Sequence, residues 1–456
     1  MKVVKFGGSS LANAAHFEQI IKIITSDEER RAIVVSAPGT RFKGDIKVTD
    51  LLIKYAEQTL AQEDTAAVEA EIIARYQEIA AYFSIADSVM EKIATVIHGL
   101  KSKSFENNDY LMAGFKARGE YLNAYLLTNV LTQLNLPAIF MDPKEVGFLV
   151  SDVAQDASVL PKTYANLANY QNETKLMIFP GFFGFTEKGE IATFSRGGSD
   201  ITGSIVARGL KASVYENFTD VDAIYSVDPH MVKNPQSIKI MTYREMRELS
   251  YAGFSVFHDE AILPAIEGQI PINVRNTNHP DLPGTMIVPE RDFHPTKFVT
   301  GVASSKRFAA LYIHRYLLNK EVGFTLKLLQ ILYKYNISYE HMPSGIDDLT
   351  IIFDRKQLND TMVKEVCDEV NDTLHPDQLE WIDDYAIIMV VGEGLQKSPH
   401  TVENIIRPLS DNEIELHMIN QGASKIAIML GTKQSDADAA VKLLYQHFFA
   451  NNQIDS

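Results

Sequence analysis

Two glycine turns, each preceded by a cation, hold the residues of this sequence best suited to chemistry on an anion. Before the first turn, Lys5 lies near the end of the expected strand "KVVKF", and a helix is expected from Leu11 onward. The small residues that would line the turn are Gly7, Gly8 and Ser9. Glycines let a phosphate approach the backbone without a Cβ clash, and N–H groups at a helix start can bind it. Lys5 would add positive charge where charge builds up in phosphoryl transfer.

The second turn strengthens this interpretation of the first. Alone, the first turn favours an ordinary surface turn, because in the usual phosphate loop the lysine follows the glycines. The segment "ATFSRGGSDITGSIVA" repeats the order of strand, glycines, hydroxyl and helix. Arg196 precedes its glycines with a planar guanidinium that suits a carboxylate, and Ser199 and Asp200 follow them. Asp200 is also a common residue at a helix start. Two such turns predict a protein that binds a nucleotide on one side and a small anion on the other.

The elements that must position these turns alternate between strand and helix over residues 1–292. Apolar runs such as "RAIVVSA" and "KLMIFPGFFGF" alternate with helical patterns such as "GEYLNAYLLTNVLTQL". Near-continuous apolar runs are typical of strands that are buried on both faces. We therefore predict an α/β fold in which helices cover both faces of an open, mostly parallel sheet. Residues 55–104, rich in Ala and Glu at helical spacing, are expected to form a helical excursion from this sheet.

A second region follows a proline-rich boundary near residues 281–298. Within it, residues 328–353 align without a gap to residues 405–430, and each copy is expected to contain a helix, a strand, a glycine turn and a strand. Two copies predict paired small α+β modules that pack side by side. Within the expected region 298–456, the modules would span about 306–380 and 384–450.

Composition excludes several classes of partner. The 456 residues include 43 Lys and Arg against 59 Asp and Glu, a formal net charge of −16. Such a surface repels nucleic acid and anionic membranes, and no apolar run reaches the ~20 residues needed to cross a bilayer. The single cysteine, Cys367, excludes an intrachain disulfide, and no His/Cys cluster predicts a metal site. We expect a cytoplasmic protein that binds neither nucleic acid nor membranes.

Several segments of the chain occur in the order seen in one known family. They include "VVKFGGSSLA", "KVTDLL", "RGEYLNAYLL", "PGFFGFTEKGEIATFSRGGSDITGSIVA", "FTDVDAIYSVDP" and "IPINVRNTNHP". In these segments the chain resembles the aspartate kinases, members of the amino-acid kinase superfamily, and its C-terminal modules look like ACT domains. The resemblance implies a three-layer αβα catalytic domain over residues 1–292 and a regulatory region with two ferredoxin-like ACT modules.

The resemblance also implies an activity. The chain would phosphorylate the β-carboxylate of L-aspartate with ATP and Mg²⁺, the first step toward lysine, threonine and methionine. We expect a monofunctional enzyme, because no chain remains after the ACT pair for a fused homoserine dehydrogenase. A carboxylate is already a nucleophile, so catalysis would consist of positioning and charge neutralisation. The lack of a His/Cys cluster suits a Mg²⁺ that is carried largely by ATP.

Carried over position by position, the resemblance gives roles to individual residues. Lys5 would stabilise the transferring phosphoryl group, and Arg196 and Asp200 would complete the catalytic set. Arg196 would clamp the aspartate α-carboxylate and Glu120 would face its α-ammonium. The other residues of the aspartate pocket would be Thr49 and Ser199. The nucleotide-binding residues would be Lys5, Gly7, Gly8, Ser9, Thr219, Asp220, Asp222, Tyr225 and Asp228.

In the C-terminal region the resemblance implies an amino-acid effector, lysine or threonine or both, and pairing of ACT modules into a homodimer or tetramer. The expected effector residues are Gly323, Phe324 and Thr325 before a helix, and Ser344, Gly345 and Asp347 on an opposite turn. A helix N-terminus can receive the effector carboxylate. The alternative is that these residues serve only as turn and cap residues.

Two functional alternatives stay open at this point. His230 and Ser255 stand where relatives have an arginine and a nucleotide-contacting lysine, so two cations near ATP are missing. One alternative is another carboxylate or carbamate kinase of the same superfamily. The other is an amino-acid sensor with weak catalytic activity. The retention of four residues argues against this alternative: Lys5, Glu120, Arg196 and Asp200.

Overall fold

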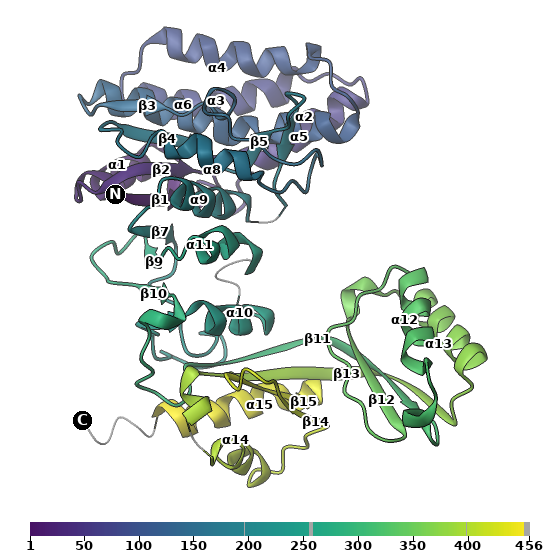
Figure 1. Ribbon diagram of the computed structural model, residues 1–456. Helices are drawn as coiled ribbons and strands as arrows, with labels where there is room; N and C mark the ends of the chain where they lie inside the picture. The colour runs from purple at the N-terminus through teal and green to yellow at the C-terminus, as the bar shows by residue number, and fades with distance from the viewer. Residues whose placement is uncertain (196, 255–258, 398, 451–456) are drawn as a thin grey trace. The chain divides into compact units, whose positions relative to one another are not determined.

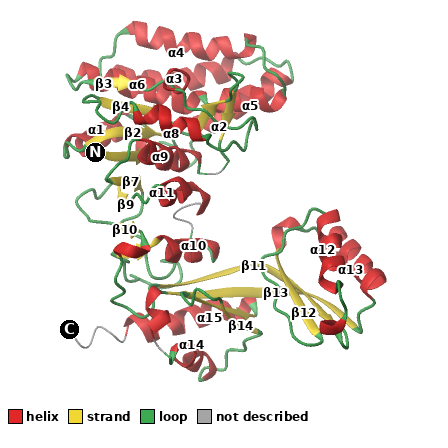
Figure 2. Cartoon of the chain, in the orientation of Figure 1, coloured by secondary structure: helices red, strands yellow, loops and turns green. Residues whose placement is uncertain are grey.

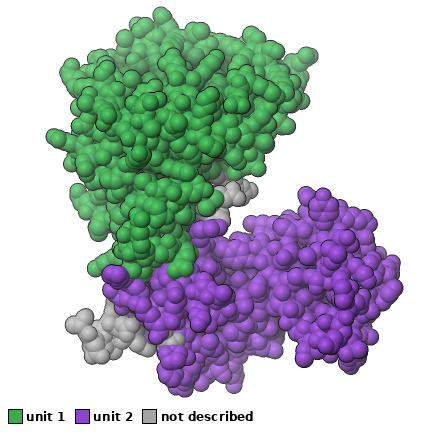
Figure 3. Space-filling view, viewed as in Figure 1, with its two compact units in different colours: residues 1–224, 237–246, 255–293 green, residues 225–236, 247–254, 294–456 purple. Residues whose placement is uncertain are grey.

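The computed structural model describes residues 1–195, 197–254, 259–397 and 399–450 (Figure 1). The chain divides into two compact units, each with its own sheet (Figure 3). Unit 1 consists of residues 1–224, 237–246 and 255–293, and unit 2 of residues 225–236, 247–254 and 294–456.

Unit 1 is built on an eight-stranded sheet with the strand order β3-β4-β2-β1-β7-β9-β10-β8. Neighbouring strands are parallel except β9 and β10, so the predicted open, mostly parallel sheet is confirmed. Its strands are β1 (Lys2–Phe6), β2 (Arg30–Val35), β3 (Ala138–Phe140), β4 (Leu176–Pro180), β7 (Val214–Thr219), β8 (Ile240–Thr242), β9 (Ile272–Asn276) and β10 (Thr285–Val288). The strands β5 (Phe183–Phe185) and β6 (Ile191–Thr193) form a separate antiparallel hairpin.

Helices connect and cover these strands (Figure 2). In unit 1 they are α1 (Ala14–Thr25), α2 (Val48–Leu60), α3 (Ala66–Tyr82), α4 (Asp87–Gly99), α5 (Asn108–Lys116), α6 (Arg118–Gln133), α7 (Pro143–Val146), α8 (Pro161–Ala168), α9 (Gly198–Gly209) and α11 (Leu263–Glu267). Helix α10 (Tyr243–Tyr251) has residues in both units. The predicted helical excursion is confirmed by α2, α3 and α4.

The alternation of side chains along β1 decides which residues reach the site. Val4 and Phe6 are fully buried in a core shared with α1, α3 and α6. Because successive side chains point to opposite faces of a strand, Lys5 lies on the other face, where α9 packs against β1. The expectation that a helix begins at Leu11 is wrong: Gly8–Leu11 is a 3₁₀ turn, and α1 begins at Ala14. Asn13 caps α1 by accepting a hydrogen bond from a backbone N–H of its first turn.

Unit 2 contains a five-stranded antiparallel sheet with the order β12-β11-β13-β15-β14. Its strands are β11 (Gly301–His314), β12 (Asp348–Asp354), β13 (Gln378–Val391), β14 (Met418–Gln421) and β15 (Ala427–Thr432). Its helices are α12 (Phe324–Lys334), α13 (Asp360–Leu374), α14 (Thr401–Ser410) and α15 (Gln434–Tyr445). Helices α12 and α13 bury one core with β12, and α14 and α15 bury a second core with β15.

The two modules of unit 2 share their longest strands. The first part of β11 pairs with the end of β13, which also pairs with β15. The second part of β11 pairs with β12 and with the beginning of β13. Strand β11 therefore contributes to both modules, and the second module includes a strand that precedes the first. In the first copy of the repeat, bridges at His341 and Ser344 stand where a strand was expected before the glycine turn. In the second copy that strand is β14.

Candidate functional site

Lys5 links the two glycine turns. Its side chain is 8% exposed, and its Nζ atom lies 2.7 Å from Oδ1 of Asp200 in the first turn of α9. Asn217, which pairs with Lys5 across β1 and β7, donates a hydrogen bond from Nδ2 to the same oxygen at 2.7 Å. The carboxylate thus compensates the buried cation, as a charge removed from water requires. The structure brings together two residues that the sequence separates by most of unit 1.

The first glycine turn packs closely against the segment that follows β2. A Cβ atom on Gly8 would lie 2.9 Å from the carbonyl oxygen of Ala37, and one on Gly39 would lie 2.6 Å from Gly8. The Gly39 N–H donates to the Gly8 carbonyl at 2.8 Å. A Cβ atom on Gly7 would lie 3.6 Å from Nζ of Lys5, so the cation is at the turn. Ser9 is exposed beside it.

The second glycine turn lies next to a strained backbone. Gly197 precedes α9 with φ of 71°, a left-handed conformation that glycine adopts readily. Phe182 also has positive φ, 77°, which is unusual for a bulky residue. The Phe182 N–H donates to Oγ1 of Thr202. The neighbouring Gly181 packs tightly against Ser199, since a Cβ atom on Gly181 would lie 2.5 Å from Oγ of Ser199. Such strain is concentrated at functional sites. The sequence signal for it was the small-residue pattern of "PGFFGF", to which no role was given.

Glu120 is a buried carboxylate beside the same segment after β2. It lies in the first turn of α6 and is 5% exposed. Burial raises its pKa to about 8, although the backbone N–H groups of Ala37 and of Glu120 itself act in the opposite direction. Its Oε2 atom has no hydrogen-bond partner among the residues that the structure describes. Thr49 lies half-buried in the first turn of α2, whose Val48 N–H donates to the Pro38 carbonyl. Glu120 and Thr49, two of the four residues predicted for the aspartate pocket, therefore adjoin the segment 37–39.

The predicted nucleotide segment begins at the end of β7. Thr219 donates from Oγ1 to Asp220 at 3.1 Å. The Oδ1 atom of Asp222 lies 2.7 Å from Nδ1 of His279 and 2.6 Å from Nδ2 of Asn276, and these two contacts lower the pKa of Asp222. Asn276 and His279 lie in the segment "IPINVRNTNHP", which contributes to the family resemblance, but no role was predicted for either residue.

The remaining residues predicted for the kinase half are Tyr225, Asp228 and Arg196. Tyr225 and Asp228 belong to unit 2, where Asp228 pairs with His230 at 2.9 Å. The His230 side chain is 95% exposed. Arg196 and Ser255 lie outside the described residues.

In unit 2, hydrogen bonds join the expected effector residue Asp347 to the segment 315–317, which precedes the other expected effector residues. Gly323 precedes α12 with φ of 85°, and the Leu317 N–H donates to Oδ1 of Asp347 at 2.7 Å. Phe324 is 1% exposed in the core of the first module, whereas Thr325 is half-buried at its edge. A nearby cavity of about 480 Å³ draws on both modules. It is lined by Tyr312, Pro343, Ser344, Gly345, Asp348, Thr350, Glu380, Ile382, Tyr385, His417 and Met418.

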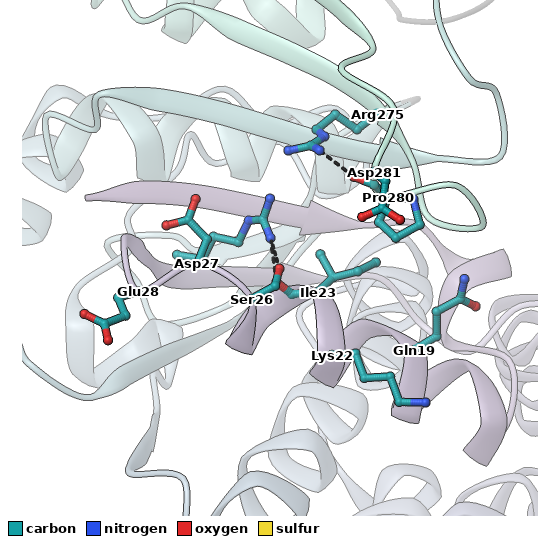
Figure 4. A pocket seen from close by; sticks show the side chains of 10 residues that line it. Gln19, Lys22, Ile23, Ser26, Asp27, Glu28, Arg275, Pro280 and Asp281 are labelled. Carbon is teal, nitrogen blue, oxygen red and sulfur yellow. Dashed lines mark hydrogen bonds between the residues drawn. The ribbon is translucent and has the colours of Figure 1, made fainter.

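A larger cavity in unit 1, about 770 Å³, includes none of the predicted site residues (Figure 4). Two of its lining residues, Arg30 and Arg275, bind the two oxygens of the buried Glu216 at 2.6 and 2.9 Å. Arg275 also donates to the Pro280 carbonyl, as Figure 4 shows. Because the Glu216 carboxylate binds both guanidinium groups and compensates part of their charge, we interpret this ion triad as part of the fold.

Among the described residues, none of the helices combines the length and apolar character that a bilayer span requires. The same part of the chain contains no group of three His, Cys, Asp or Glu side chains placed to hold a metal ion. A magnesium ion at Lys5 and Asp200 would therefore have to take most of its ligands from phosphate and water, which is how Mg²⁺ is commonly held.

Comparison with known proteins supplies the family context. The profile of the "Amino acid kinase family" matches residues 1–276, and an "ACT domain" profile matches residues 388–448. Aspartokinase 3 of Bacillus subtilis (strain 168) is 45% identical over 450 residues, covering 99% of this chain and 99% of that protein. The crystal structure of Clostridium acetobutylicum aspartate kinase superposes with a TM-score of 0.87 at 35% identity, covering 98% of this chain and 100% of that chain.

Two structures of E. coli aspartokinase III share the fold at 24% identity. One is a complex with aspartate and ADP, with a TM-score of 0.72, and covers 98% of this chain and 100% of that chain. The other is a complex with lysine and aspartate, with a TM-score of 0.75, and covers 98% and 99%.

Proposed function

We propose residue roles for this chain on the premise that it belongs to the amino acid kinase family and, within it, to the aspartokinases. Its reaction is the ATP-dependent phosphorylation of the β-carboxylate of L-aspartate, which gives 4-phospho-L-aspartate at the start of lysine, threonine and methionine biosynthesis. An ACT domain adds feedback regulation by an amino acid. The observation that carries the residue roles is the buried Lys5, which lies at one glycine turn and pairs with Asp200 at the other.

Lys5 is proposed to neutralise the charge that develops on the transferring phosphoryl group. Its burial supports this role, because an ion pair or phosphate contact is stronger where water is excluded. Asp200, oriented by a hydrogen bond from Asn217, holds the ammonium group at the turn before ATP arrives. Mg²⁺ that enters with ATP would neutralise phosphate charge, with the carboxylate of Asp200 as its protein ligand. No general base is required, because the acceptor carboxylate of aspartate is already ionised.

Glu120 is proposed to bind the α-ammonium of L-aspartate. A buried carboxylate with an unpartnered oxygen gains a counter-charge and hydrogen bonds when an ammonium group enters. Thr49 and Ser199 would line the same pocket, and Arg196 would bind the α-carboxylate. Aspartate is bound in the two E. coli structures, which supports a carboxylate substrate of this size.

Thr219, Asp220 and Asp222 are proposed to contact the adenosine part of ATP, together with Gly7, Gly8 and Ser9 at its phosphates. Asp222 is already oriented by Asn276 and His279, so these two residues would fix its direction toward the nucleotide. The roles of Tyr225 and Asp228 stay predictions. ADP in the E. coli complex supports the use of an adenine nucleotide.

The first ACT module is proposed to bind the amino-acid effector and to pair with a second copy of the chain. Ser344 and Gly345 line a cavity, and Asp347 is bound to the segment before Gly323 and Thr325. Apolar side chains are exposed around these residues: Leu317, Val322, Leu326 and Ile346, at 61 to 98%. Such a patch is typical of a protein interface. Lysine in one E. coli structure supports lysine as an effector, with threonine as the other candidate. The cytoplasmic location stays a prediction.

One assay tests the reaction and both alternatives. The enzyme is incubated with ATP, Mg²⁺ and either L-aspartate or L-glutamate, and hydroxylamine traps the acyl phosphate as a hydroxamate. We expect hydroxamate with L-aspartate. Hydroxamate with L-glutamate alone would mean a different carboxylate kinase, and none with either would mean an amino-acid sensor. Adding lysine or threonine to the same assay identifies the effector by inhibition.

A further inference from the structure

Arg75 is a buried cation outside every segment that carries the family resemblance. It lies on α3, in the helical excursion, and is 3% exposed. Its guanidinium donates from Nη2 to the Gly39 carbonyl at 2.5 Å and from Nη1 to the Ile46 carbonyl at 2.8 Å. The two carbonyls belong to the two ends of the loop that follows β2. One side chain thus fixes the width of that loop.

Gly39 connects this guanidinium to the phosphate turn. Its carbonyl accepts from Arg75, while its N–H donates to the Gly8 carbonyl at 2.8 Å. The approach is close, because a Cβ atom on Gly39 would lie 2.6 Å from the carbonyl carbon and oxygen of Gly8 and 2.8 Å from the Ser9 nitrogen. A shift of Gly39 must therefore displace Gly8 or Ser9. Arg75, Gly39 and Gly8 form a continuous series of contacts from α3 to the turn.

The loop offers Arg75 a compensating charge. The Asp45 carboxylate accepts from Nε of Arg41 at 3.0 Å and lies 3.3 Å from Nη1 of Arg75. The hydrogen bond from Arg41 holds the pKa of Asp45 well below its usual range, despite its burial. Asp45 is therefore ionised whenever the enzyme is active. Arg41 and Arg75 therefore both pair with the Asp45 carboxylate, and Arg75 also donates to the Gly39 carbonyl.

The next residue of α3 supports the other half of the site. Tyr76 is fully buried and donates from its hydroxyl to the Gly119 carbonyl at 3.0 Å. Gly119 precedes Glu120, and a Cβ atom on it would lie 2.6 Å from Cβ of Ala37. Two consecutive residues thus support two substrate pockets, Arg75 on the ATP side and Tyr76 on the aspartate side.

We propose that Arg75 is a positioning residue for phosphoryl transfer, which holds the Gly7–Ser9 turn in the shape that receives the ATP phosphates. The proposal rests on the function proposed above for that turn. Arg75 acts through Gly39 and touches no reacting atom. Its effect follows from the sensitivity of phosphoryl transfer to placement, since a displacement of ~1 Å can cost about 10²-fold in rate.

A double-mutant cycle in the full-length enzyme separates positioning from general stability. The variants are Arg75→Met, Gly39→Ala and the double variant, assayed by hydroxamate formation at varied ATP. We expect each single change to lower kcat/KM for ATP by about 10- to 100-fold. The double variant should be no worse than threefold below the weaker single one, because both changes act on the same contact.

Arg30 is the matched control. It is 5% exposed, and its described contacts include the Ile23 carbonyl and the Glu216 carboxylate but not Gly39. Arg30→Met also removes a buried guanidinium and should lower the thermal midpoint as much as Arg75→Met does. Its kcat/KM for ATP, measured on folded enzyme, should stay within threefold of wild type. When Arg30→Met is combined with Gly39→Ala, the fold-changes in kcat/KM for ATP of the two variants should multiply.

Arg75→Lys is a second test variant, to be used if Arg75→Met does not fold. It keeps the charge and can bind only one of the two carbonyls, so an intermediate loss of kcat/KM for ATP is expected at a near-normal thermal midpoint. Normal kcat/KM for ATP in folded Arg75→Met or Arg75→Lys, or effects that multiply with Gly39→Ala, would overturn the proposal. Lys5→Ala distinguishes a failure of the function proposed for the turn from a failure of the positioning role proposed for Arg75. If it stays active, the role of the turn itself is wrong. If it is inactive while Arg75→Met is normal, only the positioning role is wrong.

Discussion

Two buried glutamates of unit 1 have pKa values that are shifted in opposite directions. Glu69, on α3, is 2% exposed and lies 2.8 Å from Nζ of Lys101 and 2.5 Å from both Nδ1 of His98 and Oγ1 of Thr65. Burial alone would raise the pKa of Glu69, but these three partners lower it to about 2. Glu120 has an unpartnered oxygen, and burial raises its pKa to about 8.

The two carboxylates differ in how many of their hydrogen-bond partners the protein supplies. The protein supplies every partner that Glu69 needs, so its charge is used to join α3 to the end of α4. The described residues leave one oxygen of Glu120 without a partner, so its ionised form is disfavoured at neutral pH and a cation that enters would favour it. The unpartnered oxygen of Glu120 is what supports its proposed role in binding the substrate ammonium.

The largest effect is expected at Lys5, a buried charge that has a partner and still belongs to the site. Lys5→Ala should lower kcat by about 10³-fold or more, because one cation at the turn is lost where phosphoryl charge develops. Aspartate binding should stay measurable by calorimetry, since Lys5 lies on the phosphate side. Near-normal kcat in the hydroxamate assay would contradict the role of Lys5.

Glu120→Gln tests the incomplete glutamate. The amide keeps the shape but loses the charge, so the KM for L-aspartate should rise about 10- to 100-fold, the worth of a hydrogen bond to a charged group. The KM for ATP should change little. The variant should be at least as stable as wild type at pH 8, because the cost of a buried carboxylate is removed. A loss of stability with unchanged aspartate KM would place Glu120 in the same class as Glu69.

Glu69→Ala tests the complete glutamate. It should lower the free energy of unfolding by about 2 kcal/mol, because hydrogen bonds to Thr65 and to two cationic groups are lost. The KM for L-aspartate and the kcat of the folded enzyme should stay within twofold of wild type. Denaturant unfolding and steady-state kinetics on the same preparation measure both quantities, and a selective rise in aspartate KM would contradict the structural role.

The two glutamates should also give pH dependences of stability of opposite sign. For Glu120, whose folded pKa is raised, the unfolded state releases its proton first, so stability falls by about 1.4 kcal/mol per pH unit between roughly pH 4.5 and 8. For Glu69, whose folded pKa is lowered, stability is present above pH 4.5 and is lost toward pH 2. The KM for L-aspartate should fall about tenfold from pH 6.5 to 8.5 as Glu120 ionises. Glu120→Gln should remove this dependence.

Sequence reasoning found the residues whose chemistry is visible in their type and order. Lys5 and the glycines stand in one short segment, and the continuous apolar runs specify a sheet buried on both faces. The start of α1 was missed although its signal was present, since Asn13 is a preferred N-cap.

Other features depend on contacts that no local pattern contains. Arg75 lies in an ordinary helical stretch, and only the fold brings its guanidinium to Gly39. The strain at Phe182 follows from packing around Ser199 and Thr202. The sharing of β11 and β13 depends on the pairing of distant strands, and the repeat alone suggested consecutive modules.

The shared strands of unit 2 dictate an order of assembly. Gly301 at the beginning of β11 pairs with Val391 at the end of β13, and the whole first module lies between them in the chain. During synthesis the first part of β11 is therefore translated before the first module, and its pairing strand at the end of β13 is translated after it. The first module can close on its own local contacts, whereas closing the second requires a long loop. Folding of the regulatory unit should thus begin with the nested module and end with the one that encloses it.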